Sequence, residues 1–176
     1  MSKVESITKV ALFSSLTAIG AQICIPIGTV PITLQVLFVL LSGMLLTPRL
    51  ALFSQLVYLL MGALGLPVFA GFKGGVAHLY GPTAGYLWSF PIASMLVSVL
   101  GSGKKGYLKR FFSSFLGLGM IYLLGWWRLA LFMNGDFYRA FQVGVLPFIG
   151  VDIAKAVLAV VIAERLRVLV TARQKA

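Results

Sequence analysis

The chain has 176 residues, of which 60% are hydrophobic and only 11% are charged. A soluble domain carries roughly 25% charged residues, because its surface must face water. The formal net charge is +11, but most of the basic residues gather in short clusters between long apolar runs rather than on one amphipathic face. This composition excludes a soluble domain and argues against a nucleic-acid-binding protein, so we expect a membrane protein.

Six apolar segments follow one another along the chain. A helix that crosses the hydrocarbon core of a bilayer needs about 20 largely apolar residues. The segments are continuously apolar, which excludes the alternating pattern of barrel strands. We therefore predict an all-α membrane protein, a compact bundle of six transmembrane helices that forms one domain over residues 1–176. The predicted spans are 10–25, 32–47, 50–66, 84–100, 111–132 and 145–163.

Small side chains recur at helical spacing along the first predicted span. Such residues let another helix approach closely in lipid. Two interpretations are open: these residues pack the helix within the bundle, or they form a docking face for a separate membrane subunit. The pairs are Ala11 and Ser15, Ser14 and Ala18, and Thr17 and Ala21.

The distribution of Lys and Arg predicts the orientation in the membrane. With both termini in the cytoplasm, eleven of the 15 basic residues lie on the cytoplasmic side, three lie outside and Lys155 lies within the sixth predicted span. Cytoplasmic loops carry such an excess, so we expect a multi-pass protein with both termini inside. The cytoplasmic residues are Lys3, Lys9, Arg49, Lys104, Lys105, Lys109, Arg110, Arg165, Arg167, Arg173 and Lys175.

The outer segment 66–85 is rich in glycine and includes Gly74 and Gly75 beside Lys73. Glycine allows backbone conformations that bring amide groups against a ligand. Long loops in compact proteins often bind ligands, although this segment can also be a re-entrant turn buried in protein. It lacks the Gly-Lys-Ser or Gly-Lys-Thr ending of a phosphate loop, so we expect no ATP site here.

Asp152 and Lys155 are ionisable residues inside the sixth predicted span. Charges at such positions are costly and usually mark function. A spacing of three places both on one helix face, within reach of each other. One interpretation is an internal ion pair that orients the helix. We favour a ligand-binding role, because Gly150 and Ala154 leave room beside the pair.

The sequence contains no pattern typical of an enzyme. His78 is the single histidine and has no nucleophile or metal-ligand cluster at useful spacing, and Cys24 is the single cysteine. A metal site and an internal disulfide are therefore not expected. The outer aromatic residues Tyr122, Trp126, Trp127 and Tyr138 are expected to form an interfacial belt.

Four stretches carry a family resemblance. They read ALFSSLTAIGAQICIP (11–26), VPITLQVLFVLLSGMLLTPRLALFSQLVYLLMGALGLPVFAG (30–71), GPTAGYLWSFP (81–91) and GVDIAKA (150–156). Together they resemble the BioY family, the biotin-binding S components of energy-coupling-factor (ECF) transporters. The last stretch fits the family's GVDxxKA pattern. In the family the outer loop is almost all glycine, whereas Phe72 and Lys73 interrupt it here.

The resemblance implies a protein of the prokaryotic cell membrane with six helices and both termini in the cytoplasm. It also implies a biotin pocket near the outer surface and a gating loop between the first two helices. It implies partnership with a transmembrane T component and two ATP-binding subunits, and it places Ala11, Ser15 and Ala18 against the T component. ATP would act only through those partners, with no cofactor in this chain. Some members are thought to work alone, so both modes of transport are open.

Biotin combines a polar ureido ring, an apolar thiophane and a carboxylate. We expect Asp152 to accept from the ureido N–H groups, and Tyr86 to form an aromatic wall and supply a hydroxyl. Lys155 either keeps Asp152 ionised or donates to the ligand, and Lys73 or the glycine-loop amides attract the carboxylate. The expected substrate-binding residues are Asp152, Lys155, Tyr86, Tyr80, Gly74, Gly75, Lys73 and Gln35.

Other functions stay open at this point. The chain can be an S component for another vitamin, such as riboflavin or thiamine. A membrane-embedded lipid acyltransferase requires a paired base and nucleophile, which the sequence lacks. A purely structural subunit would leave Asp152 and Lys155 without a role.

Overall fold

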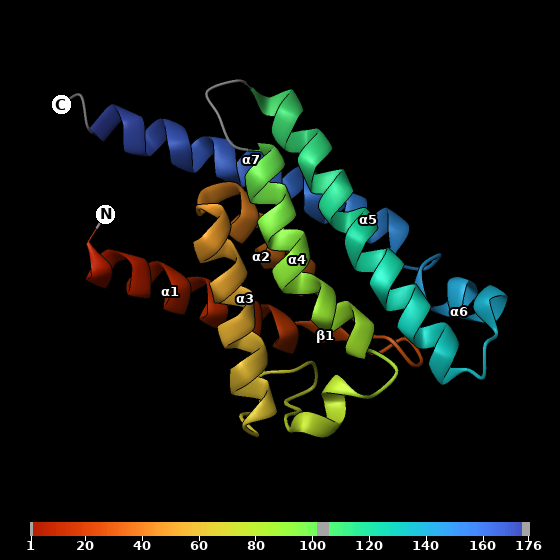
Figure 1. The fold of residues 1–176 in the computed structure, drawn as a ribbon. Coiled ribbons are helices and arrows are strands. Elements are labelled where there is room, and N and C mark those ends of the chain that lie inside the picture. Colours follow the sequence, from red (N-terminus) through yellow and green to blue (C-terminus); the bar gives the residue numbers. More distant parts are fainter. Residues whose placement is uncertain (1, 102–105, 174–176) are drawn as a thin grey trace.

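The structure, a computed structural model, describes residues 2–101 and 106–173, with side chains to residue 167. The predicted cytoplasmic residues Lys104, Lys105 and Lys175 lie outside the described residues. The regular secondary structure of the described part is helical apart from two short strands, which confirms the predicted all-α fold class (Figure 1). Its elements are α1 (Lys3–Gln22), β1 (Cys24–Ile25), β2 (Ile32–Thr33), α2 (Gln35–Leu45), α3 (Pro48–Ala63), the 3₁₀ helix η1 (Val76–Leu79), α4 (Ala84–Gly101), α5 (Tyr107–Phe132), α6 (Phe137–Gly144) and α7 (Ile149–Arg173).

Local sequence explains where several helices begin. Before α1, the side chain of Ser2 accepts a 3.1 Å hydrogen bond from the Glu5 amide. Asp136 caps α6 in the same way, accepting from the Arg139 amide at 2.9 Å. Such caps satisfy amides that have no partner within the helix. Pro48 stands in the first turn of α3, where its missing N–H costs nothing.

Helix α4 lies at the centre of the bundle and packs against α2, α3 and α5. Glycines allow the closest contacts. Gly85 of α4 lies against the backbone of Leu124 in α5, and Gly43 of α2 lies against Ser94 in α4, with no space for a β-carbon at either glycine. Small residues at helix contacts are typical of bundles in lipid, where close packing replaces the hydrophobic effect between helices.

Within the described part of the chain, three helices, α1, α4 and α5, are long and apolar enough to cross a membrane, and the pair α6 and α7, bent by 52°, can make a fourth span. Helices α2 and α3 are shorter apolar helices, so six crossings stay a prediction. Large apolar side chains such as Leu12, Phe53 and Leu123 are exposed on the outward helix faces. This is the arrangement expected when lipid surrounds the protein.

Two predicted spans begin later than expected, and one helix was not predicted. Helix α2 begins at Gln35, because Ile32–Thr33 pairs with Cys24–Ile25 as antiparallel strands. Helix α7 begins at Ile149, after Pro147, and the separate helix α6 occupies part of the predicted outer segment.

The small residues of α1 divide between two faces. Ser14, Thr17 and Ala21 are buried, and the Ser14 hydroxyl donates to the Ser54 carbonyl of α3 at 2.6 Å. Ala11 and Ser15 are exposed, and Ala18 is half-buried. One face of α1 therefore packs within the bundle, while a second small-residue face is open.

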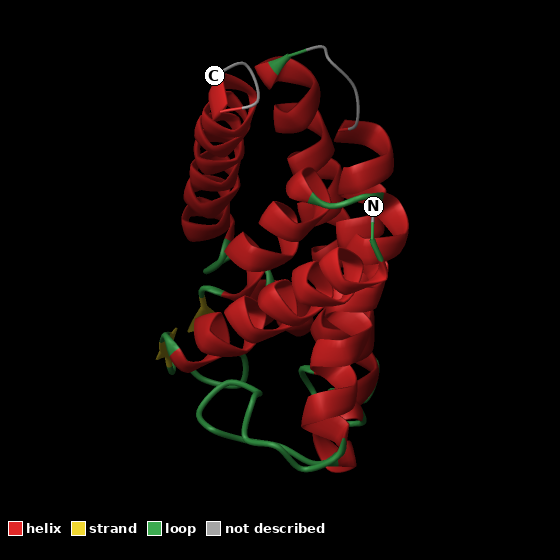
Figure 2. Cartoon of the chain, turned by 90° about the vertical axis from the view of Figure 1, so that its left-hand side faces the viewer, coloured by secondary structure: helices red, strands yellow, loops and turns green. Residues whose placement is uncertain are grey.

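The α3–α4 loop, residues 64–83, lies at one end of the molecule. In Figure 2 both termini lie in the upper half, and this loop lies at the bottom. The first residues of α2 and the corner between α6 and α7 also border the cavity described next.

Candidate substrate-binding site

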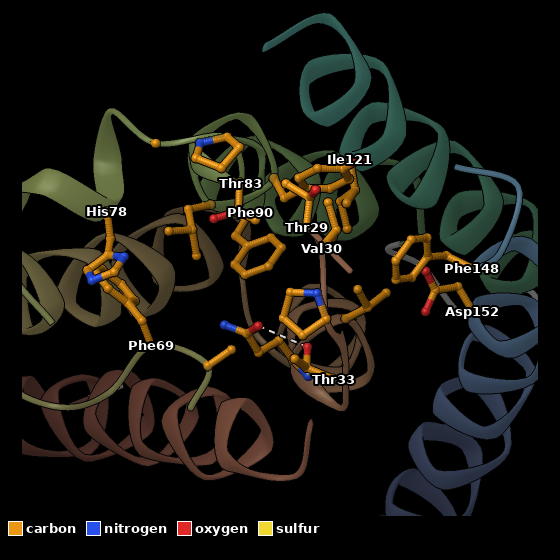
Figure 3. A pocket seen from close by; sticks show the side chains of 18 of the residues that line it. Thr29, Val30, Thr33, Phe69, His78, Thr83, Phe90, Ile121, Phe148 and Asp152 are labelled. Carbon is orange, nitrogen blue, oxygen red and sulfur yellow. Dashed lines mark hydrogen bonds between the residues drawn. The ribbon is translucent and has the colours of Figure 1, made fainter. Parts of the chain in front are cut away.

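A cavity of about 290 Å³ lies beside the α3–α4 loop. Its wall is formed by the segment 29–36, the α3–α4 loop, and inward-facing residues of α4, α5 and α7 (Figure 3). Most of these side chains are apolar or aromatic, with a few polar groups among them. Small-molecule sites in proteins have this composition, and their volumes begin near 300 Å³.

One end of the cavity holds a buried ion pair. Lys155 Nζ lies 2.6 Å from Asp152 Oδ1, as their spacing on the helix predicted. The Tyr122 hydroxyl donates a 2.8 Å hydrogen bond to the other carboxylate oxygen, Oδ2. Asp152 is 3% exposed and Lys155 is 6% exposed. Burial of a charge is strongly unfavourable without such partners, so the three side chains stabilise one another.

The carboxylate of Asp152 still has capacity for a ligand. An ionised carboxylate offers about four acceptor positions. Lys155 and Tyr122 each occupy one, and Asp152 itself lines the cavity. The Asp152 carboxylate therefore takes part in the internal ion pair and also faces the cavity. The interpretation as a structural ion pair and the interpretation as a ligand-binding group are compatible.

Tyr122 was expected in the interfacial aromatic belt, and this expectation is wrong. The side chain faces the cavity because it lies on the buried face of α5, with Leu118 one turn before it and Gly125 nearly one turn after it. That helical spacing was visible in the sequence. Trp127 and Tyr138 are exposed, whereas Trp126 donates to the Phe137 carbonyl at 2.8 Å.

Tyr86 lines the cavity, and its hydroxyl has a protein partner. The hydroxyl donates to the Gly144 carbonyl at 2.6 Å, at the corner between α6 and α7. A β-carbon at Gly125 or Gly144 would collide with the Tyr86 side chain. These two glycines create the space for Tyr86, which in turn holds the corner that precedes Phe148 and Asp152.

Gln35 lines the cavity at the first residue of α2 and belongs to a buried polar chain. Its Oε1 accepts from the Thr33 hydroxyl at 2.9 Å, and its Nε2 donates to the Tyr58 hydroxyl at 2.5 Å. Tyr58 donates in turn to the Val68 carbonyl at 3.2 Å. The chain of bonds fixes the Gln35 amide and joins the cavity wall to the α3–α4 loop.

The opposite end of the cavity is aromatic and basic. In Figure 3, Phe69 and His78 lie together, across the cavity from Phe148 and Asp152. The rings of Phe69 and His78 meet edge to face at 6.1 Å. Lys73 also lines the cavity, and its backbone is paired with that of Phe69. Basic groups therefore lie at this end and the carboxylate of Asp152 lies at the other.

Three predicted site residues do not line the cavity. Tyr80 is 66% exposed, and its carbonyl accepts a hydrogen bond from Arg128. The Gly75 amide donates to the Gly62 carbonyl at 2.7 Å, and Gly74 packs against the carbonyl of Leu66. These residues shape the α3–α4 loop around the cavity.

Several lining residues were missed in the sequence. Phe69, Thr33 and Phe148 lie in loops or short strands, where no periodicity indicates an inward face, and His78 carried no motif. Within the described residues, no group of three His, Cys, Asp or Glu side chains can hold a metal ion.

The fold and the cavity define a class of protein: a helical membrane protein with an internal cavity that lies between a buried carboxylate and an aromatic wall. The sequence model of the BioY family matches residues 1–172. The chain belongs to the BioY family.

Individual relatives agree with this assignment. The chain is 54% identical over 165 residues to a probable biotin transporter BioY of Pyrococcus horikoshii, covering 94% of this chain and 98% of that protein. It is 41% identical over 163 residues to a biotin transporter BioY of Thermotoga maritima, covering 93% and 96%. Both relatives are named transporters, in agreement with the expectation of a transport protein rather than an enzyme.

A solved structure shares the fold. The crystal structure at 2.1 Å of the S-component for biotin from an ECF-type ABC transporter superposes with a TM-score of 0.85, at 29% sequence identity. The match covers 95% of this chain and 94% of that chain. The helical bundle described above is therefore that of an ECF S component.

Proposed function

We propose that this chain captures biotin from outside the cell and is the substrate-specific S component of an ECF transporter. One observation carries the proposal: the buried carboxylate of Asp152 lines a cavity whose far end is aromatic and basic. A ligand with N–H donors at one end and a carboxylate at the other complements this arrangement. The names of the relatives and of the solved structure support biotin as that ligand.

The proposed pose follows from hydrogen-bonding chemistry. The ureido N–H groups donate to Asp152, which Lys155 holds in place through the 2.6 Å ion pair. The thiophane lies among Tyr86, Phe69 and neighbouring aromatic rings. The carboxylate points toward Lys73 and His78. Gln35 offers a fixed amide at the wall, while Tyr80, Gly74 and Gly75 act indirectly by shaping the loop.

The orientation and partners are part of the same proposal. We place both termini in the cytoplasm, because that places the excess of Lys and Arg inside. The partners are a transmembrane T component and two ATP-binding subunits, which supply the energy for uptake. The open small-residue face of α1, at Ala11, Ser15 and Ala18, is the proposed contact with the T component.

Calorimetry on the purified chain in lipid nanodiscs tests the ligand. We expect biotin to bind and riboflavin or thiamine not to compete; competition by either vitamin would assign the chain to a different substrate. Asp152→Asn should weaken biotin binding tenfold or more, because a desolvated polar group left without its partner costs about 1–3 kcal/mol. Unchanged affinity would remove Asp152 from the site.

Vesicle uptake tests the mode of transport. The chain is reconstituted alone or with T and ATP-binding subunits, and uptake of labelled biotin is measured with and without ATP. Uptake only with partners and ATP supports the S-component proposal. Equal uptake by the chain alone would show that it transports biotin without them.

A further inference from the structure

Gln22, the last residue of α1, holds the α3–α4 loop by its side chain. Its Nε2 lies 3.3 Å from the carbonyl oxygens of Pro67 and Phe69. Its Oε1 accepts from the Phe72 amide at 2.9 Å. One side-chain amide therefore contacts three backbone groups of a loop more than 40 residues away in sequence. Among the described residues that line the cavity, none belongs to α1.

The loop needs this support because its backbone is strained. Phe69 and Lys73 exchange two backbone hydrogen bonds, of 2.9 and 3.2 Å, across a tight turn. Within that turn Gly71 has a φ of 73° and Phe72 a φ of 58°. The left-handed region is unfavourable for residues other than glycine. The Phe72 side chain is 71% exposed, so side-chain packing does not hold this residue in place. The hydrogen bond from its backbone amide to Gln22 does.

The same turn carries two residues of the cavity wall. Phe69 is 3% exposed and meets Tyr58 edge to face at 5.7 Å. Its ring fills the space over Gly62, where a β-carbon would collide with it. Lys73, at the other end of the turn, also lines the cavity. The position of both residues depends on the turn that Gln22 holds.

We propose that Gln22 is a positioning residue for substrate binding. It lines no part of the cavity, but it fixes the turn at residues 69–73 so that Phe69 and Lys73 close one side of the substrate cavity. Loss of the Gln22 side-chain amide lets this turn move away from the cavity, so that the ligand can leave between the turn and the rest of the cavity wall. The inference rests on the proposed function, because the ligand whose release it controls is biotin.

Gln22→Met tests the proposal, since methionine keeps the length of the side chain and removes its hydrogen-bonding groups. We expect biotin to dissociate roughly tenfold faster from the full chain in nanodiscs, as loss of about 1.4 kcal/mol of hydrogen bonding would give. Gln142→Met is the matched control, because Gln142 is exposed on α6 outside the cavity. Its dissociation rate should stay within about twofold of wild type. An unchanged rate in Gln22→Met overturns the proposal.

A double-mutant cycle shows whether Gln22 acts through Phe69. In a Phe69→Ala background, Gln22→Met should change the dissociation rate much less than in wild type, because the positioned ring is already gone. Equal effects in both backgrounds overturn the proposal. Gln22→Asn keeps the amide but shortens its reach, so it should behave like Gln22→Met and replaces that variant if its yield is low.

Hydrogen–deuterium exchange separates this inference from the proposed function. Without any ligand, the amide protons of residues 69–73 should exchange faster in Gln22→Met than in wild type or Gln142→Met. If the wild-type chain binds no biotin, the proposed function fails, and the exchange measurement still tests the hold of Gln22 on the turn. Unchanged exchange overturns the positioning role, whatever the ligand.

Discussion

The Tyr122 hydroxyl donates a 2.8 Å hydrogen bond to Oδ2 of Asp152 and thereby joins α5 to α7 inside the cavity. Lys155 holds the other oxygen from one turn further along α7. Two partners on different helices fix the plane of the carboxylate before any ligand arrives. Such preorganisation reduces the ordering cost of binding, because the acceptor does not have to find its position.

Tyr122→Phe should therefore weaken biotin binding although the phenyl ring stays in the cavity wall. A hydrogen bond to a charged group is worth about 1.5–3 kcal/mol, of which only part acts on the bound state, so we expect a loss of roughly three- to tenfold. Calorimetry measures the affinity. Tyr138→Phe, on an exposed tyrosine outside the cavity, is the matched control and should leave it unchanged. Equal affinities for wild type and Tyr122→Phe would show that the bond does not prepare the site.

Lys155→Met should destabilise the fold as well as the site. It leaves a buried carboxylate with only Tyr122 as a side-chain partner, and breaking a buried pair on one side costs about 3–5 kcal/mol. A clear fall in the thermal unfolding temperature should accompany the loss of biotin binding.

The double variant Asp152→Asn, Lys155→Met separates these two effects. It removes both charges, so much of the lost thermal stability should return while biotin binding stays weak. Recovery of tight binding in the double variant would mean that neither charge contacts the ligand, which contradicts the proposed pose.

Tyr86→Phe distinguishes a wall residue from a hydrogen-bond donor to the ligand. The hydroxyl already donates to the Gly144 carbonyl, so its removal should lower stability by about 1 kcal/mol and biotin affinity by less than about threefold. Tyr86→Leu also removes the ring and should reduce affinity further. A loss of more than tenfold in Tyr86→Phe would show that the hydroxyl turns to the ligand when biotin binds.

The ion pair and the overall bundle could be predicted because each depends on local sequence. Six apolar stretches indicate helices in lipid, and a separation of three residues is enough to bring Lys155 to Asp152 on one helix. The start of α7 also had a local signal in the sequence. A proline disfavours helical conformation in the residue before it, and Pro147 lies two positions before the first residue of α7.

The position of the loop residues could not be predicted in this way. Phe69 reaches the cavity because Gly62 leaves space for its ring and Gln22 holds the turn that carries it. The contact with Gln22 joins segments 47 residues apart in sequence, and no periodicity within residues 64–83 indicates either contact. The same holds for Thr33, whose inward direction depends on the pairing of β1 with β2.

The open face of α1 gives the last prediction. Ala11 and Ser15 are exposed and small, so a partner helix can approach closely there. Ala11→Trp or Ser15→Trp should block that approach while leaving the cavity, which contains no described residue of α1, unchanged. We expect biotin binding by the isolated chain to stay at the wild-type level, and partner-dependent uptake into vesicles to fall at least tenfold.

A tryptophan elsewhere on the lipid-facing surface controls for bulk alone. Leu123 is exposed on α5, so Leu123→Trp adds a similar ring away from α1. Uptake by this variant should stay near the wild-type level. Because Ser14 and Thr17 on the buried face of α1 already bond to α3, the helix cannot rotate to hide a tryptophan at position 11 or 15 without breaking those bonds. Normal uptake by both α1 variants would therefore exclude this face as the site of partner contact.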